Sequence, residues 1–180
     1  MKKALIIMGL ISLITSCCSK ICPKKADFFT IPATPYYGNQ LRLDGCFYQK
    51  WNDNGIQSFC KVLFLYNNGV VFNCSGSGHL TDLDKFLVEI RDDDFYSTHK
   101  TSWGVFFIEN DHIIFERFFG SELGYLVYRE EGNIVNDTTF IMTEVSRMKQ
   151  GVKTEIRPIE WTYHFKAFSP KPDSTNSFIP

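Results

Sequence analysis

Hydroxyl side chains and one histidine gather in a glycine-rich stretch at residues 75–81. The side chains are those of Ser75, Ser77, His79 and Thr81. A hydrolase needs a nucleophile beside a base and an orienting acid, and α/β-hydrolases hold the serine in a G-x-S-x-G turn between a strand and a helix. The stretch lacks that pattern and is typical of a loop that leads into a helix. We expect the protein not to be an enzyme and to carry no cofactor.

Cysteines and acidic runs are the candidate metal ligands. Cys46, Cys60 and Cys74 lie 14 residues apart, with an Asn-Gly pair in each interval, whereas zinc sites use closely spaced pairs such as C-x2-C. The acidic runs at 92–94 and 130–131 lack the alternating spacing of a calcium loop and are typical of solvated turns. We therefore expect no metal site.

The pairing of the cysteines depends on the first predicted turn. If Asn54 and Gly55 form a two-residue turn, Cys46 and Cys60 fall on opposite faces of their hairpin. Two cysteines that point to opposite faces cannot be bridged without backbone movement. We expect free, packed thiols.

The charge balance excludes one class of partner. The 180 residues contain 19 Lys and Arg against 20 Asp and Glu, and removal of residues 1–16 takes away Lys2 and Lys3 and no acidic residue. The remaining chain is mildly acidic and has no basic block of the kind that neutralises phosphates, so we expect no nucleic-acid partner. With 44% apolar and 16% aromatic residues, its length suits one domain with a substantial core.

Alternation of apolar and polar residues after residue 40 predicts half-buried strands, separated by Asn-Gly and other turn residues. Residues 82–91 are the exception, because Leu83, Phe86, Leu87 and Ile90 follow helical spacing. We expect this helix to pack on the sheet, in one arrangement across a barrel mouth. The predicted strands are 41–51, 58–66, from 70 through 72, 103–109, 112–119, 125–130, 138–146 and 160–168, with a turn at 131–133 before the seventh.

Eight short strands joined by tight turns favour closure, because an open sheet would leave long unpaired edges. The sequence therefore predicts an all-β fold: an eight-stranded antiparallel up-and-down barrel with one amphipathic helix between the third and fourth strands. The interior of such a barrel is either filled by side chains or holds one small ligand. The residues we expect to line a ligand pocket are Phe47, Gln49, Trp51, Trp103 and Tyr163, and a filled aromatic core is the alternative.

The N-terminus carries two lysines, an apolar run from Ala4 to Ile14, and then Ile14-Thr15-Ser16-Cys17. This order is that of a secretory signal, and the run is too short to span a bilayer. The segment resembles the lipobox of bacterial lipoproteins. The resemblance implies cleavage after residue 16 and acylation of Cys17, with chains such as palmitate. We expect a signal peptide at 1–16, an acylated tether at 17–40, a barrel domain at 41–168 and a C-terminal tail at 169–180 that lies on the barrel or hangs free.

Gly45-Cys46-Phe47-Tyr48 resembles the G-x-W motif of lipocalins, with Phe in place of Trp. The domain from Leu41 to Phe168 resembles a lipocalin-like lipoprotein of the Bacteroidota type. Two short patterns, 137–139 and 173–175, resemble the acceptor of protein O-glycosylation in that lineage, at Thr138 and Ser174. Positions 18–20 hold neither an inner-membrane retention Asp nor an acidic surface-export run, so the resemblance implies an outer-membrane anchor with the domain facing the periplasm.

Two functions are compatible with these patterns. The first is a lipid-anchored envelope protein that binds a small apolar or amphipathic ligand in the barrel. The second is an accessory or structural lipoprotein that docks on an envelope protein through its outer face. Large apolar residues of both strand parities, including Phe106 and Phe118, favour the second.

Overall fold

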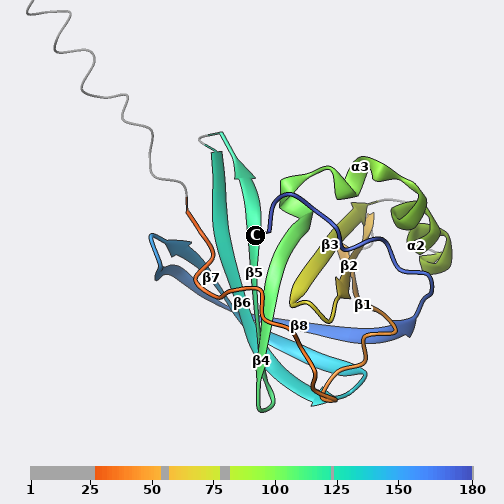
Figure 1. Ribbon diagram of the computed structural model, residues 1–180, viewed down its shortest axis with the longest axis horizontal. Helices are drawn as coiled ribbons and strands as arrows, with labels where there is room; N and C mark the ends of the chain where they lie inside the picture. The colour runs from red at the N-terminus through yellow and green to blue at the C-terminus, as the bar shows by residue number, and fades with distance from the viewer. Residues whose placement is uncertain (1–26, 54–56, 78–81, 123, 180) are drawn as a thin grey trace, which may run out of the picture.

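The computed structural model describes residues 27–53, 57–77, 82–122 and 124–179, and its strands form a closed barrel (Figure 1). Each strand pairs antiparallel with the next along the chain, and the last pairs with the first. The predicted eight-stranded up-and-down barrel is confirmed. The strands are β1 (Gly45–Asp53), β2 (Gln57–Leu65), β3 (Val70–Ser77), β4 (Trp103–Glu109), β5 (His112–Ser121), β6 (Gly124–Asn136), β7 (Thr139–Lys149) and β8 (Val152–Ala167).

The alternation of side chains along the strands produces two apolar layers. One layer lies inside the barrel and includes Phe47, Leu63 and Phe140, and the other lies on the outer face of β1, β2 and β3 and includes Val62, Phe64 and Phe72. Odd positions of β2 thus face inward and even positions face outward, because successive side chains of a strand point to opposite faces. Both faces of these three strands are buried, and a helix must cover the outer one.

The predicted helix lies on that outer face. It runs as α2 from Leu83 to Asp92, with Asp82 as its N-cap accepting a hydrogen bond from the backbone N–H of Lys85. Its buried residues Leu83, Phe86, Leu87 and Ile90 belong to the outer apolar layer. The helix therefore packs on the barrel, as predicted, but against the wall of β1–β3 and not across a mouth (Figure 1). The short helices α3 (Asp94–Ser97) and η2 (Lys100–Ser102) follow it.

The register of the first hairpin corrects the prediction for the cysteines. Asp53 pairs with Gln57 and Lys50 pairs with Cys60, so three residues separate the paired strand ends, not two. Cys46 and Cys60 therefore share the outer face, and both lie in the layer beneath α2. They are nonetheless free and buried, as predicted. Burial raises the pKa of Cys46 to about 12 and that of Cys60 to about 11, which keeps both as packed thiols.

The turn predicted at 131–133 is also corrected. Residues 131–133 lie within β6, and the chain turns after Asn136, whose side-chain oxygen accepts from the backbone N–H of Thr138. Gly132 marks a β-bulge, where the register of β6 and β7 shifts. A Cβ at Gly132 would lie 2.0 Å from the carbonyl oxygen of Ile141, so this position requires glycine for close approach and not for a turn.

The N-terminal segment from residue 27 packs on the barrel, although the sequence analysis assigned 17–40 to a tether. The backbone N–H and hydroxyl of Thr30 each donate to Glu116 at 2.6 Å. The ring of Phe29 lies 4.3 Å from that of Phe118. A buried carboxylate on the outer face of β5 needs donors, and the segment supplies some of them beside the guanidinium of Arg129. The segment from Asp27 onward is thus part of the folded barrel domain. The first strand, β1, begins at Gly45 and not at Leu41.

The tail also lies on the barrel, which is one of the two predicted arrangements. The side chain of Lys171 donates to the carbonyl oxygens of Leu43 and Leu65 at 2.8 and 2.9 Å, and the hydroxyl of Tyr66 donates to the carbonyl of Pro172. The tail passes the α2 side and ends near β5 (Figure 1). In the described parts of the chain, no helix has the length and apolarity required to cross a bilayer.

Candidate functional site: a charged cavity in the barrel wall

Most of the barrel interior is filled by aromatic side chains. The ring of Phe140 lies 5.0 Å from that of Phe47, 5.7 Å from that of Phe115 and 4.8 Å from that of Tyr163. These four residues come from β1, β5, β7 and β8 and are fully buried. Rings from strands on either side of β6 and on either side of β8 therefore meet, and this part of the interior has the packing of a core.

Three charged side chains interrupt the apolar interior. The ammonium of Lys61 on β2 lies 3.1 Å from both carboxylate oxygens of Glu130 on β6. The guanidinium of Arg117 on β5 donates a hydrogen bond to the same carboxylate. Lys61 also lies 5.0 Å from the ring of Trp161 and 5.7 Å from that of Tyr163. We call Lys61, Arg117 and Glu130 the charged cluster.

The charged cluster has one positive charge more than it has negative charge. Although burial disfavours the ionised carboxylate, the charges of Arg117 and Lys61 and their hydrogen bonds lower the pKa of Glu130 to about 2. Burial, together with the charge of Arg117, lowers the pKa of Lys61 to about 8, against the opposing effect of Glu130. At neutral pH Lys61 and Glu130 are therefore ionised, and a guanidinium stays charged in proteins. No other described carboxylate pairs with Lys61 or Arg117.

A gap in the barrel wall exposes one end of the charged cluster. β3 pairs with β4 only from Val70 to Phe72, whereas β3 continues to Ser77 and β5 continues to Ser121. The ends of β3 and β5 thus lack a strand between them. The helix η2 contacts both strands and lies at this gap. The gap holds a cavity of about 430 Å³, which we call the seam cavity.

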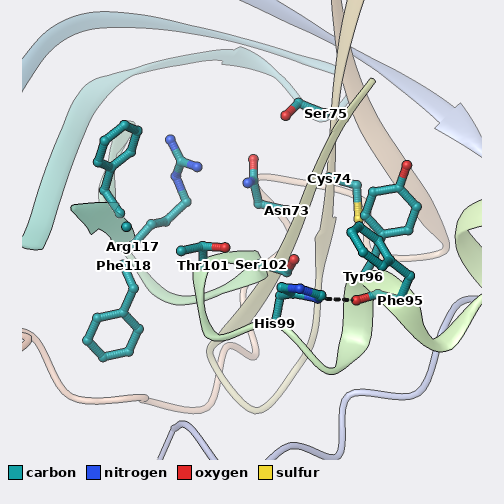
Figure 2. Close-up of a pocket in the computed structure, with 12 residues that line it drawn as sticks. Asn73, Cys74, Ser75, Phe95, Tyr96, His99, Thr101, Ser102, Arg117 and Phe118 are labelled. Atoms are coloured by element: carbon teal, nitrogen blue, oxygen red, sulfur yellow. Dashed lines mark hydrogen bonds between the residues drawn. The ribbon is translucent and has the colours of Figure 1, made fainter. Parts of the chain in front are cut away.

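The seam cavity has a polar side and an aromatic side. Figure 2 shows Arg117 and Phe118 entering from one side and Tyr96, Phe95 and His99 from the other. Helix α3 and the loop after it present the aromatic residues, and His99 is fixed by a hydrogen bond between its Nδ1 and the carbonyl of Phe95. The remaining lining residues are Asn73, Cys74, Ser75, Thr101, Ser102, Phe119 and Gly120.

Two buried polar atoms near the charged cluster have no hydrogen-bond partner among the described residues. They are the side-chain oxygen of Asn73, which lines the seam cavity, and the hydroxyl of Tyr163, which lies inside the barrel near Lys61. A buried polar atom without a partner is destabilising, and such atoms are commonly satisfied by water or a ligand. Asn73 therefore marks the cavity as a place for a polar group.

The five residues predicted to line a ligand pocket do not come together around one. Phe47 and Tyr163 belong to the filled interior, and the inward-facing Gln49 pairs in register with Lys61. Trp51 is 41% exposed and stacks on Phe59. Trp103 faces the other way, stacking on Phe72 in the outer layer at 4.6 Å. None of the five lines the seam cavity.

Other predicted sites have different outcomes. Cys17, like His79 and Thr81 of the glycine-rich stretch, lies outside the described residues. Thr138 and Ser174 are both partly exposed, in the β6–β7 turn and in the tail. Glu130 and Glu131 lie in strand β6 and not in a solvated turn, and Glu130 is 3% exposed.

The residues thought to favour protein docking are not available on the outer face. Phe106 points into the barrel and belongs to the interior layer. Phe118 does face outward, but Phe29 and Ile179 from the two terminal segments cover it. The chain therefore buries this apolar surface against itself.

The charged cluster was missed by the sequence analysis. Lys61 shares strand parity with Leu63 and Leu65, and Arg117 shares it with Phe115. The available signal was a charged residue at a strand position whose side chain points to the same face as apolar core residues. Glu130 gave none, because the predicted strand ended at this residue, directly before the turn predicted at 131–133.

Comparisons with known proteins identify no relative: no protein-family model, no curated protein and no solved structure matches the chain.

Proposed function

We propose that this chain is a lipid-anchored, lipocalin-like envelope protein that binds a small amphipathic molecule in the seam cavity. The observation that carries the proposal is the position of Arg117, which belongs both to the buried charged cluster and to the lining of the cavity. A cavity with an aromatic side and a polar side that includes one charged group has the composition of a site for an amphipathic ligand. Its volume of about 430 Å³ lies within the usual range for small ligands.

The position of the site differs from the one expected for a barrel of this size. The interior between β1, β5, β7 and β8 is filled by rings, so a ligand enters the wall between the ends of β3 and β5. An aromatic surface on α3 receives the apolar part of the molecule, and the polar side around Arg117 receives its polar end. This arrangement favours an amphipathic ligand over a purely apolar one.

A cavity-filling substitution tests ligand binding. A Cβ at Gly120 would lie 3.7 Å from the Thr101 side chain, so the position tolerates a side chain that points toward the cavity lining. We expect Gly120→Phe to exclude the ligand. The protein is isolated from envelopes, and its bound small molecules are extracted and identified by mass spectrometry.

The matched control for this experiment is Glu109→Phe, which places the same ring at the exposed end of β4. Protein with the wild-type sequence and the Glu109→Phe variant should carry a molecule that the Gly120→Phe variant lacks. The same molecules in all three, or none in any, would contradict binding in the seam cavity.

The anchor is tested separately. We propose that Cys17 is acylated after removal of residues 1–16, and that the barrel faces the periplasm from the outer membrane. Mass spectrometry of the membrane-extracted protein should find an acylated N-terminus at Cys17, and Cys17→Ala should abolish the anchor. Protease added to intact cells should leave the barrel uncut until the outer membrane is permeabilised. Retention of residues 1–16, or digestion on intact cells, would contradict the respective part of the proposal.

A further inference from the structure

We infer that the polar end of the ligand is an anion, a carboxylate or a phosphate, held by Arg117 at the polar side of the seam cavity. This inference rests on the proposed function and specifies the chemistry of its ligand. It is carried by the free donors of Arg117 and by the charge balance of the cluster.

Arg117 has donors to spare. A guanidinium carries five N–H donors. Among the described residues, Arg117 forms its hydrogen bond and its ion pair with Glu130 alone. The side chain is 17% exposed and lines the cavity. Guanidinium groups bind carboxylates and phosphates through two parallel hydrogen bonds. The unused edge of Arg117 is therefore a site for an oxyanion.

The charge balance points to the same ligand class. Lys61 and Arg117 share the single carboxylate of Glu130, and all three side chains are largely withdrawn from water. An uncompensated charge in a poorly solvated place is unfavourable, and an anion bound beside it removes that cost. A neutral or cationic polar end would leave the positive charge uncompensated or add to it.

Asn73 provides the second polar contact. Its buried side-chain oxygen has no donor among the described residues, and the residue lines the cavity together with Arg117. Figure 2 shows Asn73 in the middle of the cavity, between Arg117 and the aromatic residues of α3. An amide oxygen accepts a hydrogen bond, so the oxygen of Asn73 suits a hydroxyl or a water beside the anion and not the oxyanion itself.

The test compares molecules that share one apolar chain and differ in their polar end. Octanoate, octyl phosphate, octanol and octyltrimethylammonium are titrated calorimetrically into the full-length chain in zwitterionic nanodiscs, with inorganic phosphate as a further ligand. Because hydrogen bonds to charged groups are stronger than neutral ones, we expect at least one of the two anions to bind about 10- to 100-fold more tightly than octanol, with no binding of the cation.

The anionic ligands distinguish the sources of the anion. Preference for octanoate identifies a carboxylate, and preference for octyl phosphate identifies a phosphate monoester. Binding of inorganic phosphate as tight as that of octyl phosphate identifies a free phosphate, which also supports an anion site. Equal binding of octanol and both anions would overturn the inference while leaving the cavity as a ligand site. Failure of every compound to bind would overturn the proposed function as well.

Two variants assign the selectivity to Arg117. Arg117→Gln should abolish the preference for the anion, and Arg117→Lys should keep part of it. Arg91→Gln, which removes an arginine from α2 outside the cavity, should keep all of it. If the Arg117 variants do not fold, Gly120→Phe provides the test without altering the charged cluster, because it should block octanoate and octanol alike. Anion preference that survives Arg117→Gln, or octanoate binding that survives Gly120→Phe, would overturn the inference.

Discussion

The ammonium of Lys61 lies 3.1 Å from both carboxylate oxygens of Glu130, inside a barrel whose other interior contacts are mainly between aromatic and aliphatic side chains. The two residues belong to β2 and β6, which lie on opposite sides of the closed barrel. Arg117 completes the arrangement from β5. One carboxylate thus holds two cations in a place with little access to water, and it determines whether both are tolerated.

Removal of that carboxylate charge should destabilise the fold strongly. Glu130→Gln leaves Lys61 and Arg117 without a counter-charge, and breaking a buried pair in this way costs about 3 to 5 kcal/mol. Lys61→Met should cost less, because Glu130 keeps Arg117 as a partner. The free energies of unfolding are measured by urea denaturation.

The matched control is Glu109→Gln at the exposed end of β4, which should change the unfolding free energy by less than about 0.5 kcal/mol. Equal and small effects of Glu109→Gln and Glu130→Gln would show that the cluster does not contribute to stability in this way.

Acid should weaken the fold through the same residue. The groups that face Glu130 are Lys61, Arg117 and Tyr163, and the pKa of its carboxyl is about 2, below the ordinary 4.5. The folded state therefore binds fewer protons than the unfolded state between these values. The stabilisation is complete above pH 4.5 and is lost as the pH falls toward 2, on the order of 3 kcal/mol in total.

The measurement compares urea midpoints at about pH 6 and about pH 3. The native protein should lose more stability between these conditions than the Glu130→Gln variant, which has no carboxyl to protonate at this position. An identical loss in both would mean that other carboxylates determine the acid sensitivity.

The architecture could be predicted because the residue spacings that indicate helices and strands are local in the sequence. The helical spacing of Leu83, Phe86, Leu87 and Ile90 predicted α2, and the alternation of the strands predicted the barrel. The turn predicted at 131–133 was wrong, because a glycine between polar residues, such as Gly132, fits a turn as well as a bulge. Only the carbonyl of Ile141, on the neighbouring strand, decides between the two.

The charged cluster and the seam cavity could not be predicted in the same way, because they are formed by residues far apart in the sequence. Lys61 and Glu130 are 69 residues apart and meet only through the closure of the barrel. The seam cavity exists because β3 and β4 pair over three residues: β4 begins at Trp103, opposite Phe72, whereas β3 continues to Ser77. Of the aromatic residues predicted to line a pocket, Phe47 and Tyr163 fill the barrel core, because the ring of Phe140 reaches both. Trp103 packs in the outer layer, and Trp51 is exposed.

The packing of α2 on the outer face leads to a further prediction. Leu87 is fully buried, whereas its neighbour Val88 is 42% exposed. Leu87→Ala should lower the free energy of unfolding by about 2 to 5 kcal/mol, since it leaves a cavity beneath the helix. Val88→Ala removes apolar atoms from the same helix and serves as the control, with an effect of about 0.5 kcal/mol or less. Similar urea midpoints for the two variants would reject this packing.

Glu116 should hold the N-terminal segment on the barrel. Its carboxylate is fully buried and accepts hydrogen bonds from the backbone N–H groups of Thr30, at 2.6 Å, and Ile31, at 3.3 Å. Glu116→Gln replaces one accepting oxygen by a donor and removes the charge, so these bonds weaken. We expect the amides of the 27–34 segment to exchange with deuterium about tenfold faster or more, because hydrogen bonds to a charged group contribute about 1.5 to 3 kcal/mol each.

The control for this prediction is Glu131→Gln. Glu131 pairs with Arg129 and Lys153 on the same outer face, but its described contacts do not include the N-terminal segment. Hydrogen exchange followed by mass spectrometry should therefore show faster exchange at 27–34 in the Glu116 variant alone. Equal protection in the two variants would mean that the other contacts of the segment suffice to hold it, among them that of Phe29 with Phe118 and the hydrogen bond from Arg129 to the Thr30 hydroxyl.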